Sequence, residues 1–171
     1  MMKIDFFDNA YITESARDDA EFGVCDPGNS QPAYTTTDAK QFQATILNPH
    51  CHTLQFVPID HNMNIRRADG DLESTCDGMI YDGKKYLAFI ELKDKKVGWA
   101  NEAVEQLRTT IDLFESNHNA KDYKHRYAFA VNVQHPVFQH SFKEVMQRFT
   151  AKTKFVLRYG TPIKIDYNDA I

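Results

Sequence analysis

The spacing of hydrophobic and polar residues along the chain follows two periods, which together predict helices and strands. Apolar residues three and four positions apart predict amphipathic helices over 98–116 and 137–151. Short runs rich in apolar and β-branched residues predict strands at 53–59, 126–133, 154–159 and 163–167. Strands that alternate with helices are typical of an α/β fold, in which helices cover a sheet.

A β-hairpin is predicted between the first of these strands and the first helix. Residues 74–81 and 85–93 form two strand-like runs, and the turn-forming pair Asp82-Gly83 lies between them. The second run is apolar at every position over 86–90, which indicates a central strand that is covered on both faces. We therefore predict an α/β fold with a single mixed β-sheet flanked by helices.

The first fifty residues carry a weaker pattern. A short helix is predicted within 11–22, and the turn formers that crowd 25–37 predict a loop. A second helix is predicted over 38–47, where it ends before a proline. The chain of 171 residues has the length of one domain. We expect one domain, with 1–50 as a helical and loop extension and 51–171 as the core.

Charge is distributed unevenly along the sequence. The net charge is −4 at pH 7, with −9 in residues 1–82 and +5 in residues 83–171. A basic half can face a phosphate backbone, while an acidic half can stay away from it or supply metal ligands. No run of like charges is long, so solubilising surface charge explains the pattern equally well. The charge pattern neither supports nor excludes a nucleic-acid partner.

Cysteine usage and hydropathy bear on the compartment. The three cysteines, Cys25, Cys51 and Cys76, are odd in number and widely spaced, which argues against a disulfide framework. The N-terminal residues lack the apolar run of a signal peptide, and no segment is apolar over the length of a bilayer. We expect a cytoplasmic protein with reduced thiols and no membrane partner.

The candidate chemistry lies in the hairpin. Glu91 and Lys93 are two positions apart on a strand, so their side chains leave the same face. A two-residue turn would send Asp77 to the opposite face. A three-residue loop at 82–84 pairs Tyr81 with position 85, which places Asp77 on the face of Glu91, about 7 Å away along the strand. We therefore predict a loop of odd length, or a bulge.

Two carboxylates and an amine on one face suit metal-assisted hydrolysis of a phosphodiester. Mg²⁺ prefers hard oxygen ligands, which Asp77, Glu91 and the backbone carbonyl of Leu92 can supply together with water. An ammonium group beside the ion, that of Lys93, stabilises negative charge in the transition state. The hypothesis assigns Asp77, Glu91 and Lys93 as the catalytic residues.

These residues in this order resemble the PD-(D/E)xK nuclease superfamily. Asp77 is followed by Glu91-Leu92-Lys93 at the end of a hairpin, and an amphipathic helix comes directly afterwards. The resemblance covers about 72–133 and implies a restriction-endonuclease-like core. It also implies a nuclease that depends on Mg²⁺ or Mn²⁺ and acts on DNA more often than on RNA. Many such nucleases are homodimers, so a homodimer is compatible with the sequence.

The sequence departs from that superfamily at three places. Position 76 is a cysteine where a proline is common. A further acid often lies on an early helix, for which Asp38 and, more remotely, Glu14 are the candidates. Some members carry a glutamine followed four residues later by a tyrosine on the helix after the lysine, whereas this chain has Gln106 and then Thr110. Gln106 remains a candidate for substrate contact or for an ordinary polar position.

Lysines after the hairpin are candidates for binding the substrate. Lys95 and Lys96 follow the hairpin closely, but Asp94 interrupts the basic run, so each lysine also fits a solvated surface position. Zinc binding by the segment 50–52, His-Cys-His, is less favoured because adjacent ligands lack the spacing of structural zinc sites.

Two other function classes stay open. One is a catalytically silent binding module that keeps the nuclease fold. The other is an interaction protein of the inhibitor or immunity type, for which the acidic first half is the motivating feature. The leading hypothesis is a metal-dependent nuclease.

Overall fold

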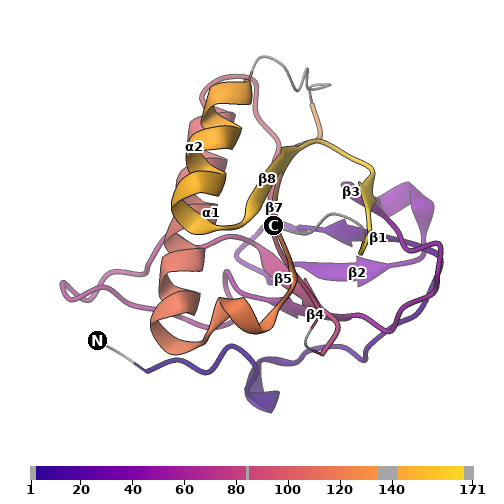
Figure 1. The fold of residues 1–171 in the computed structure, drawn as a ribbon, viewed down its shortest axis with the longest axis horizontal. Helices are drawn as coiled ribbons and strands as arrows, with labels where there is room; N and C mark the ends of the chain where they lie inside the picture. Colours follow the sequence, from indigo (N-terminus) through magenta and orange to yellow (C-terminus); the bar gives the residue numbers. More distant parts are fainter. Residues whose placement is uncertain (1–2, 84, 135–141, 168–171) are drawn as a thin grey trace.

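A computed structural model of the protein describes residues 3–83, 85–134 and 142–167 (Figure 1). The strands are β1 (Glu21–Cys25), β2 (Tyr34–Thr36), β3 (Ala44–Leu47), β4 (Gln55–Pro58), β5 (Gly78–Tyr81), β6 (Tyr86–Lys93), β7 (His125–Asn132), β8 (Val156–Tyr159) and β9 (Ile163–Lys164). The helices are α1 (Trp99–Asn117) and α2 (Lys143–Thr153), with 3-10 turns at Asn9–Tyr11, Ala39–Gln41 and Ala120–Asp122.

These elements confirm the predicted hairpin and the predicted strands from residue 53 onward. They also confirm the helix predicted over 98–116. For the helix predicted over 137–151, positions 137–141 lie outside the described residues, and α2 confirms the helix from residue 143 onward. No helix in the described part of the chain is long and apolar enough to cross a membrane.

The strands form two mixed sheets, so the prediction of a single sheet is wrong. The first sheet has the order β4-β5-β6-β7-β8, with β6 at its centre and β6, β7 and β8 parallel to one another. The second sheet has the order β2-β1-β3-β9, in which β3 and β9 are parallel. The hairpin that carries the candidate chemistry consists of β5 and β6. It lies inside the first sheet, because β4 and β7 flank it.

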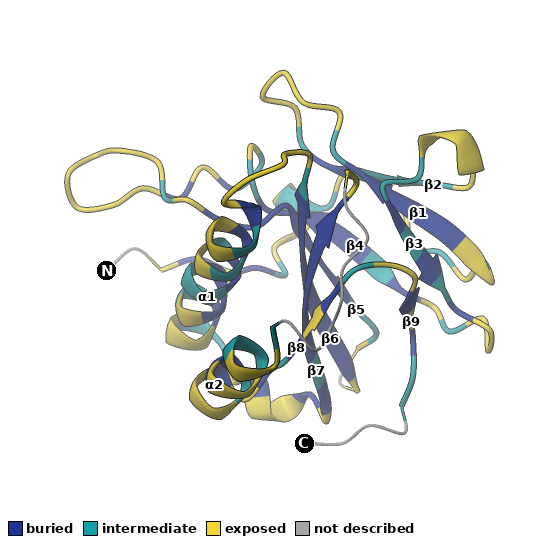
Figure 2. Cartoon of the chain, turned by 90° about the horizontal axis from the view of Figure 1, so that it is seen from above, coloured by how far each residue is buried: buried dark blue, intermediate teal, exposed yellow. Residues whose placement is uncertain are grey.

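The molecule has three layers, with the first sheet in the middle (Figure 2). Helices α1 and α2 cover one face of this sheet, where apolar residues of α1 such as Leu107, Ile111 and Phe114 pack against Leu87 and Phe89 of β6. The second sheet covers the opposite face and buries a separate core. The near-continuous apolar sequence of β6 follows from this arrangement, since both of its faces are covered.

The helices predicted within 11–22 and over 38–47 are wrong. In the first region, residues 12–20 form no helix, and β1 begins at Glu21, with Phe22 buried in the core between the sheets. In the second region, burial alternates along β3, as expected for a strand with one covered face. Both strands gain their stability from packing on the first sheet, which outweighs local helix propensity.

Candidate metal and catalytic site

The register of the hairpin places Asp77 directly opposite Glu91. Gly78 of β5 pairs with Ile90 of β6, so the residue before Gly78 meets the residue after Ile90. The backbone N–H of Asp77 donates a hydrogen bond to Oε2 of Glu91 at 3.1 Å. Residues that face each other across antiparallel strands share a face, so the two carboxylates belong to one site.

The predicted pairing of Tyr81 with Lys85 is wrong, because Tyr81 pairs with Leu87. Asp82 sets this register: its N–H donates to the carbonyl of Tyr86 at 3.2 Å, and its Oδ1 accepts the N–H of Tyr86 at 2.7 Å. Five residues, 82–86, lie between the last paired positions, so the loop has an odd length, as predicted, but it is longer than the predicted three residues. It contains Gly83, whose φ of 64° suits glycine. The register shifts by two positions, an even number, so Asp77 keeps its predicted face.

The ammonium group of Lys93 lies on the same face of the strand and forms an ion pair with Glu91. Its Nζ is 2.7 Å from Oε1 of Glu91, and it also donates a hydrogen bond to Oε1 of Gln106 on helix α1. The Nε2 of Gln106 donates to the carbonyl of Thr75 at 3.0 Å. Gln106 therefore holds the lysine to the helix independently of the carboxylate.

The two carboxylates are buried, with 9% of Asp77 and 2% of Glu91 exposed. The pKa of Asp77 is raised from 3.8 to about 7, mainly by burial. The charges of Asp26 and Asp60 also contribute to this rise, whereas the N–H of Leu92 and the charge of Lys93 oppose it. Burial, followed by the Asp77 carboxylate, raises the pKa of Glu91 well above its ordinary value. One ammonium group thus faces two buried acids, and a further positive charge would stabilise their ionised forms.

The backbone of Leu92 completes the set of oxygen donors. The N–H of Leu92 donates to Oδ2 of Asp77 at 2.7 Å. Because the N–H and the carbonyl of one residue in a strand point toward the same neighbouring strand, the Leu92 carbonyl also points toward the β5 side. The carbonyl of the next residue, Lys93, faces β7 instead, where it accepts the N–H of Val133 at 2.9 Å. This alternation directs the Leu92 carbonyl toward Asp77, as metal binding requires.

The donor set fits Mg²⁺ or Mn²⁺ but provides few protein ligands. The described residues contain no group of three or more His, Cys, Asp or Glu side chains arranged to hold a metal ion. This count also leaves the zinc alternative at 50–52 without structural support. Two carboxylates and one carbonyl suit Mg²⁺, which retains several water ligands and is often held by one or two carboxylates.

The other candidates from the sequence have varied surroundings. Lys95 forms an ion pair with Glu102 at 2.6 Å, and its carbonyl accepts a hydrogen bond from Asn132 at 2.8 Å. Lys96 is exposed in the same loop, three residues after Lys93. A hollow of about 420 Å³ beside Gln106 is lined by Glu102 and a second glutamate, which would repel phosphate.

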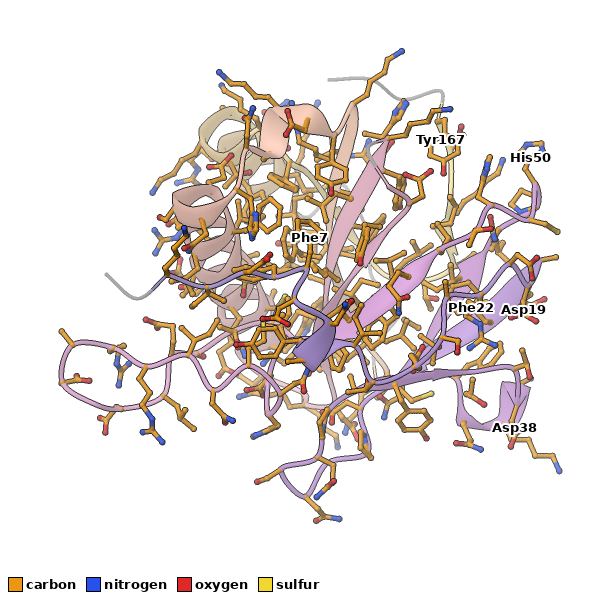
Figure 3. All side chains as sticks on the ribbon, turned by 90° about the horizontal axis from the view of Figure 1, so that it is seen from below. Phe7, Asp19, Phe22, Asp38, His50 and Tyr167 are labelled. Atoms are coloured by element: carbon orange, nitrogen blue, oxygen red, sulfur yellow. The ribbon has the colours of Figure 1, made fainter. Side chains whose placement is uncertain are left out.

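The two candidates for a further acid have partners elsewhere. Glu14 accepts the backbone N–H and the hydroxyl of Thr35, and Asp38 accepts the N–H of Lys40 at 3.2 Å. Asp38 lies at the edge of the second sheet, far from the helices (Figure 3). Asp60 is closer, since its N–H donates to the carbonyl of Cys76 at 3.2 Å. Sequence reasoning missed Asp60 because it comes from the loop after β4, where no motif marks it.

Comparisons with known proteins add no relative to this description. No protein-family model matches the sequence, and neither the curated proteins nor the solved structures contain a significant match.

Proposed function

We propose that the protein is a metal-dependent nuclease that hydrolyses phosphodiester bonds, in DNA rather than RNA. In this proposal the first sheet with its two helices is a restriction-endonuclease-like core. The observation that carries the proposal is the position of Asp77 directly opposite Glu91, with the Lys93 ammonium 2.7 Å from the same glutamate. Two buried acids share one amine on this strand face, and burying a charge that is not fully compensated destabilises a fold, so we attribute the second acid to function.

Each residue of the site has a defined task. Asp77, Glu91 and the carbonyl of Leu92 would hold Mg²⁺ or Mn²⁺, which supplies positive charge at the phosphate and activates water. Lys93 stabilises the negative charge that develops during the reaction. Gln106 keeps the ammonium group in place when Glu91 turns to the ion, because its hydrogen bond to Lys93 does not involve the carboxylate. The exposed side chain of Lys96 can meet a neighbouring phosphate.

Cleavage assays test the proposal directly. The wild type, Glu91→Ala and the control Glu105→Ala, which changes an exposed glutamate of α1, are incubated with single- and double-stranded DNA and RNA. Mg²⁺, Mn²⁺ or EDTA is present in parallel reactions. We expect the wild type and the control to cleave DNA with either ion, and Glu91→Ala to lose at least about 100-fold in rate. Equal cleavage by all three proteins would identify a contaminating nuclease.

A catalytically silent binding module is the second candidate. Both oxygens of Glu91 already have partners within the chain, Lys93 and the N–H of Asp77, so this carboxylate is satisfied without an ion. Such a module would bind nucleic acid, measured by fluorescence anisotropy, without cleaving it in Mg²⁺ or Mn²⁺. That result would refute the nuclease assignment.

A further inference from the structure

Thr110 of helix α1 is a fully buried threonine whose hydroxyl makes two hydrogen bonds. Its Oγ1 accepts the backbone N–H of Cys76 at 2.8 Å and donates to the carbonyl of Gln106 at 2.8 Å. Cys76 immediately precedes Asp77. The hydroxyl of Thr110 therefore links helix α1 to the segment that precedes Asp77.

The same helix holds the other end of that peptide group. The carbonyl of Thr75 and the N–H of Cys76 belong to one planar unit, and they point in opposite directions. Gln106 donates to the carbonyl at 3.0 Å, while Thr110 accepts from the N–H. Gln106 and Thr110 are four residues apart and lie on one face of α1. The helix therefore forms hydrogen bonds with both polar groups of the 75–76 peptide.

We propose that Thr110 is a positioning residue, which with Gln106 fixes the orientation of the 75–76 peptide and thereby the place of Asp77 opposite Glu91. This inference rests on the proposed function. Gln106 also binds Lys93, so one turn of α1 fixes the amine and, through the peptide, the acid. Helix α1 thus sets the spacing between groups that come from two different strands.

Removing the hydroxyl of Thr110 removes the hydrogen bond that its oxygen accepts from the Cys76 N–H. Thr110→Val keeps the shape of the side chain but leaves the Cys76 N–H buried without an acceptor, which favours rotation of the peptide toward another partner. The Asp77 carboxylate moves with it and no longer shares an ion with Glu91 in the same geometry. Loss of such supporting contacts lowers metal affinity by about 10- to 100-fold.

The chain offers a matched control on helix α2. Thr153 is also buried, its hydroxyl donates to the carbonyl of Phe149 at 2.9 Å, and it accepts the N–H of Phe155 at 3.1 Å. Thr153→Val therefore removes the same two kinds of hydrogen bond without touching the candidate site. Comparing the two valine variants separates a loss of stability from a loss of positioning.

The test is a Mn²⁺ titration, followed by calorimetry and by the electron paramagnetic resonance signal of free Mn²⁺, without any substrate. We expect Thr110→Val to bind Mn²⁺ about 10- to 100-fold more weakly than the wild type. Thr110→Ser, which restores the hydroxyl, should bind within about threefold of the wild type, as should Thr153→Val. If the valine variant does not fold, Thr110→Cys, with its weaker hydrogen-bonding group, should show an intermediate loss.

The outcomes separate this inference from the proposed function. If Thr110→Val or Thr110→Cys binds Mn²⁺ as tightly as the wild type, and its melting temperature falls as much as that of Thr153→Val, then Thr110 contributes to stability and not to positioning. Equal weakening by Thr110→Ser and Thr110→Val would also overturn the role of the hydroxyl. A wild-type protein that binds no Mn²⁺ would refute the proposed function, and this inference with it.

Discussion

Replacing Asp77 by asparagine is expected to stabilise the metal-free protein at neutral and alkaline pH. Burial raises the pKa of Asp77 from 3.8 to about 7. Below about pH 4 the carboxyl is protonated in both the folded and the unfolded protein, so it has no net effect on the free energy of unfolding. Between about pH 4 and 7 only the folded protein holds the proton, and the free energy of unfolding falls as the pH rises.

The size of the effect follows from the shift in pKa. One pKa unit corresponds to about 1.36 kcal/mol, so a shift of about 3 units costs about 4 kcal/mol above pH 7. An asparagine at this position does not ionise, and its amide oxygen can still accept the N–H of Leu92. Asp77→Asn should therefore match the wild type near pH 4 and exceed it by up to about 4 kcal/mol at pH 8.

Urea denaturation in EDTA at pH 4, 6 and 8 measures this difference. The control is Asp112→Asn, which makes the same change at an aspartate that is 55% exposed on α1 instead of buried. A difference for Asp77→Asn that stays constant between pH 4 and 8, or that reverses in sign, would refute the argument from burial.

Three further predictions concern the ion, the hairpin and the thiols. Millimolar Mn²⁺ at pH 7.5 should raise the melting temperature of the wild type in a thermal-shift assay but not that of Asp77→Asn, because an ion that binds only the folded protein stabilises it. Gly78→Ala should lower the free energy of unfolding by about 1–3 kcal/mol in urea, since its Cβ would lie 2.5 Å from the ring of Phe56; an unchanged value would show that Phe56 can move aside. In the native protein the exposed Cys51 should react with Ellman's reagent well before the buried Cys76, whose pKa burial raises; simultaneous reaction would contradict that burial.

The sequence was sufficient to predict the hairpin and the face of each candidate residue. Glu91 and Lys93 share a face through the period of two in a strand, and Asp77 joins them for any loop of odd length. The exact register could not be predicted because it depends on Asp82, whose side chain accepts the N–H of Tyr86. The pairing is shifted by two positions from the predicted one. A turn signal identifies the loop, but not which of its flanking residues pair.

The second sheet could not be predicted because its strands depend on distant partners. Strand β2 has three residues, which is too short a pattern to recognise. The strand at β9 was predicted, but its pairing with β3, more than a hundred residues earlier, was not. The contact between Thr110 and Cys76 was likewise hidden, since it joins residues 34 positions apart. Local pattern identified the candidate chemistry, whereas the contacts that support it come from tertiary packing.

The parallel pairing of β3 with β9 has a consequence for synthesis on the ribosome. Ile46 pairs with Ile163, so the second sheet remains incomplete until the segment beyond β8 has emerged. A nascent chain that stops earlier would lack this strand, and the apolar surface that β9 helps to cover would be open to chaperones or to aggregation. Closing so long a loop is slow, because its entropic cost precedes the gain from contacts. We therefore expect the second sheet to close only after every strand of the first sheet has been synthesised.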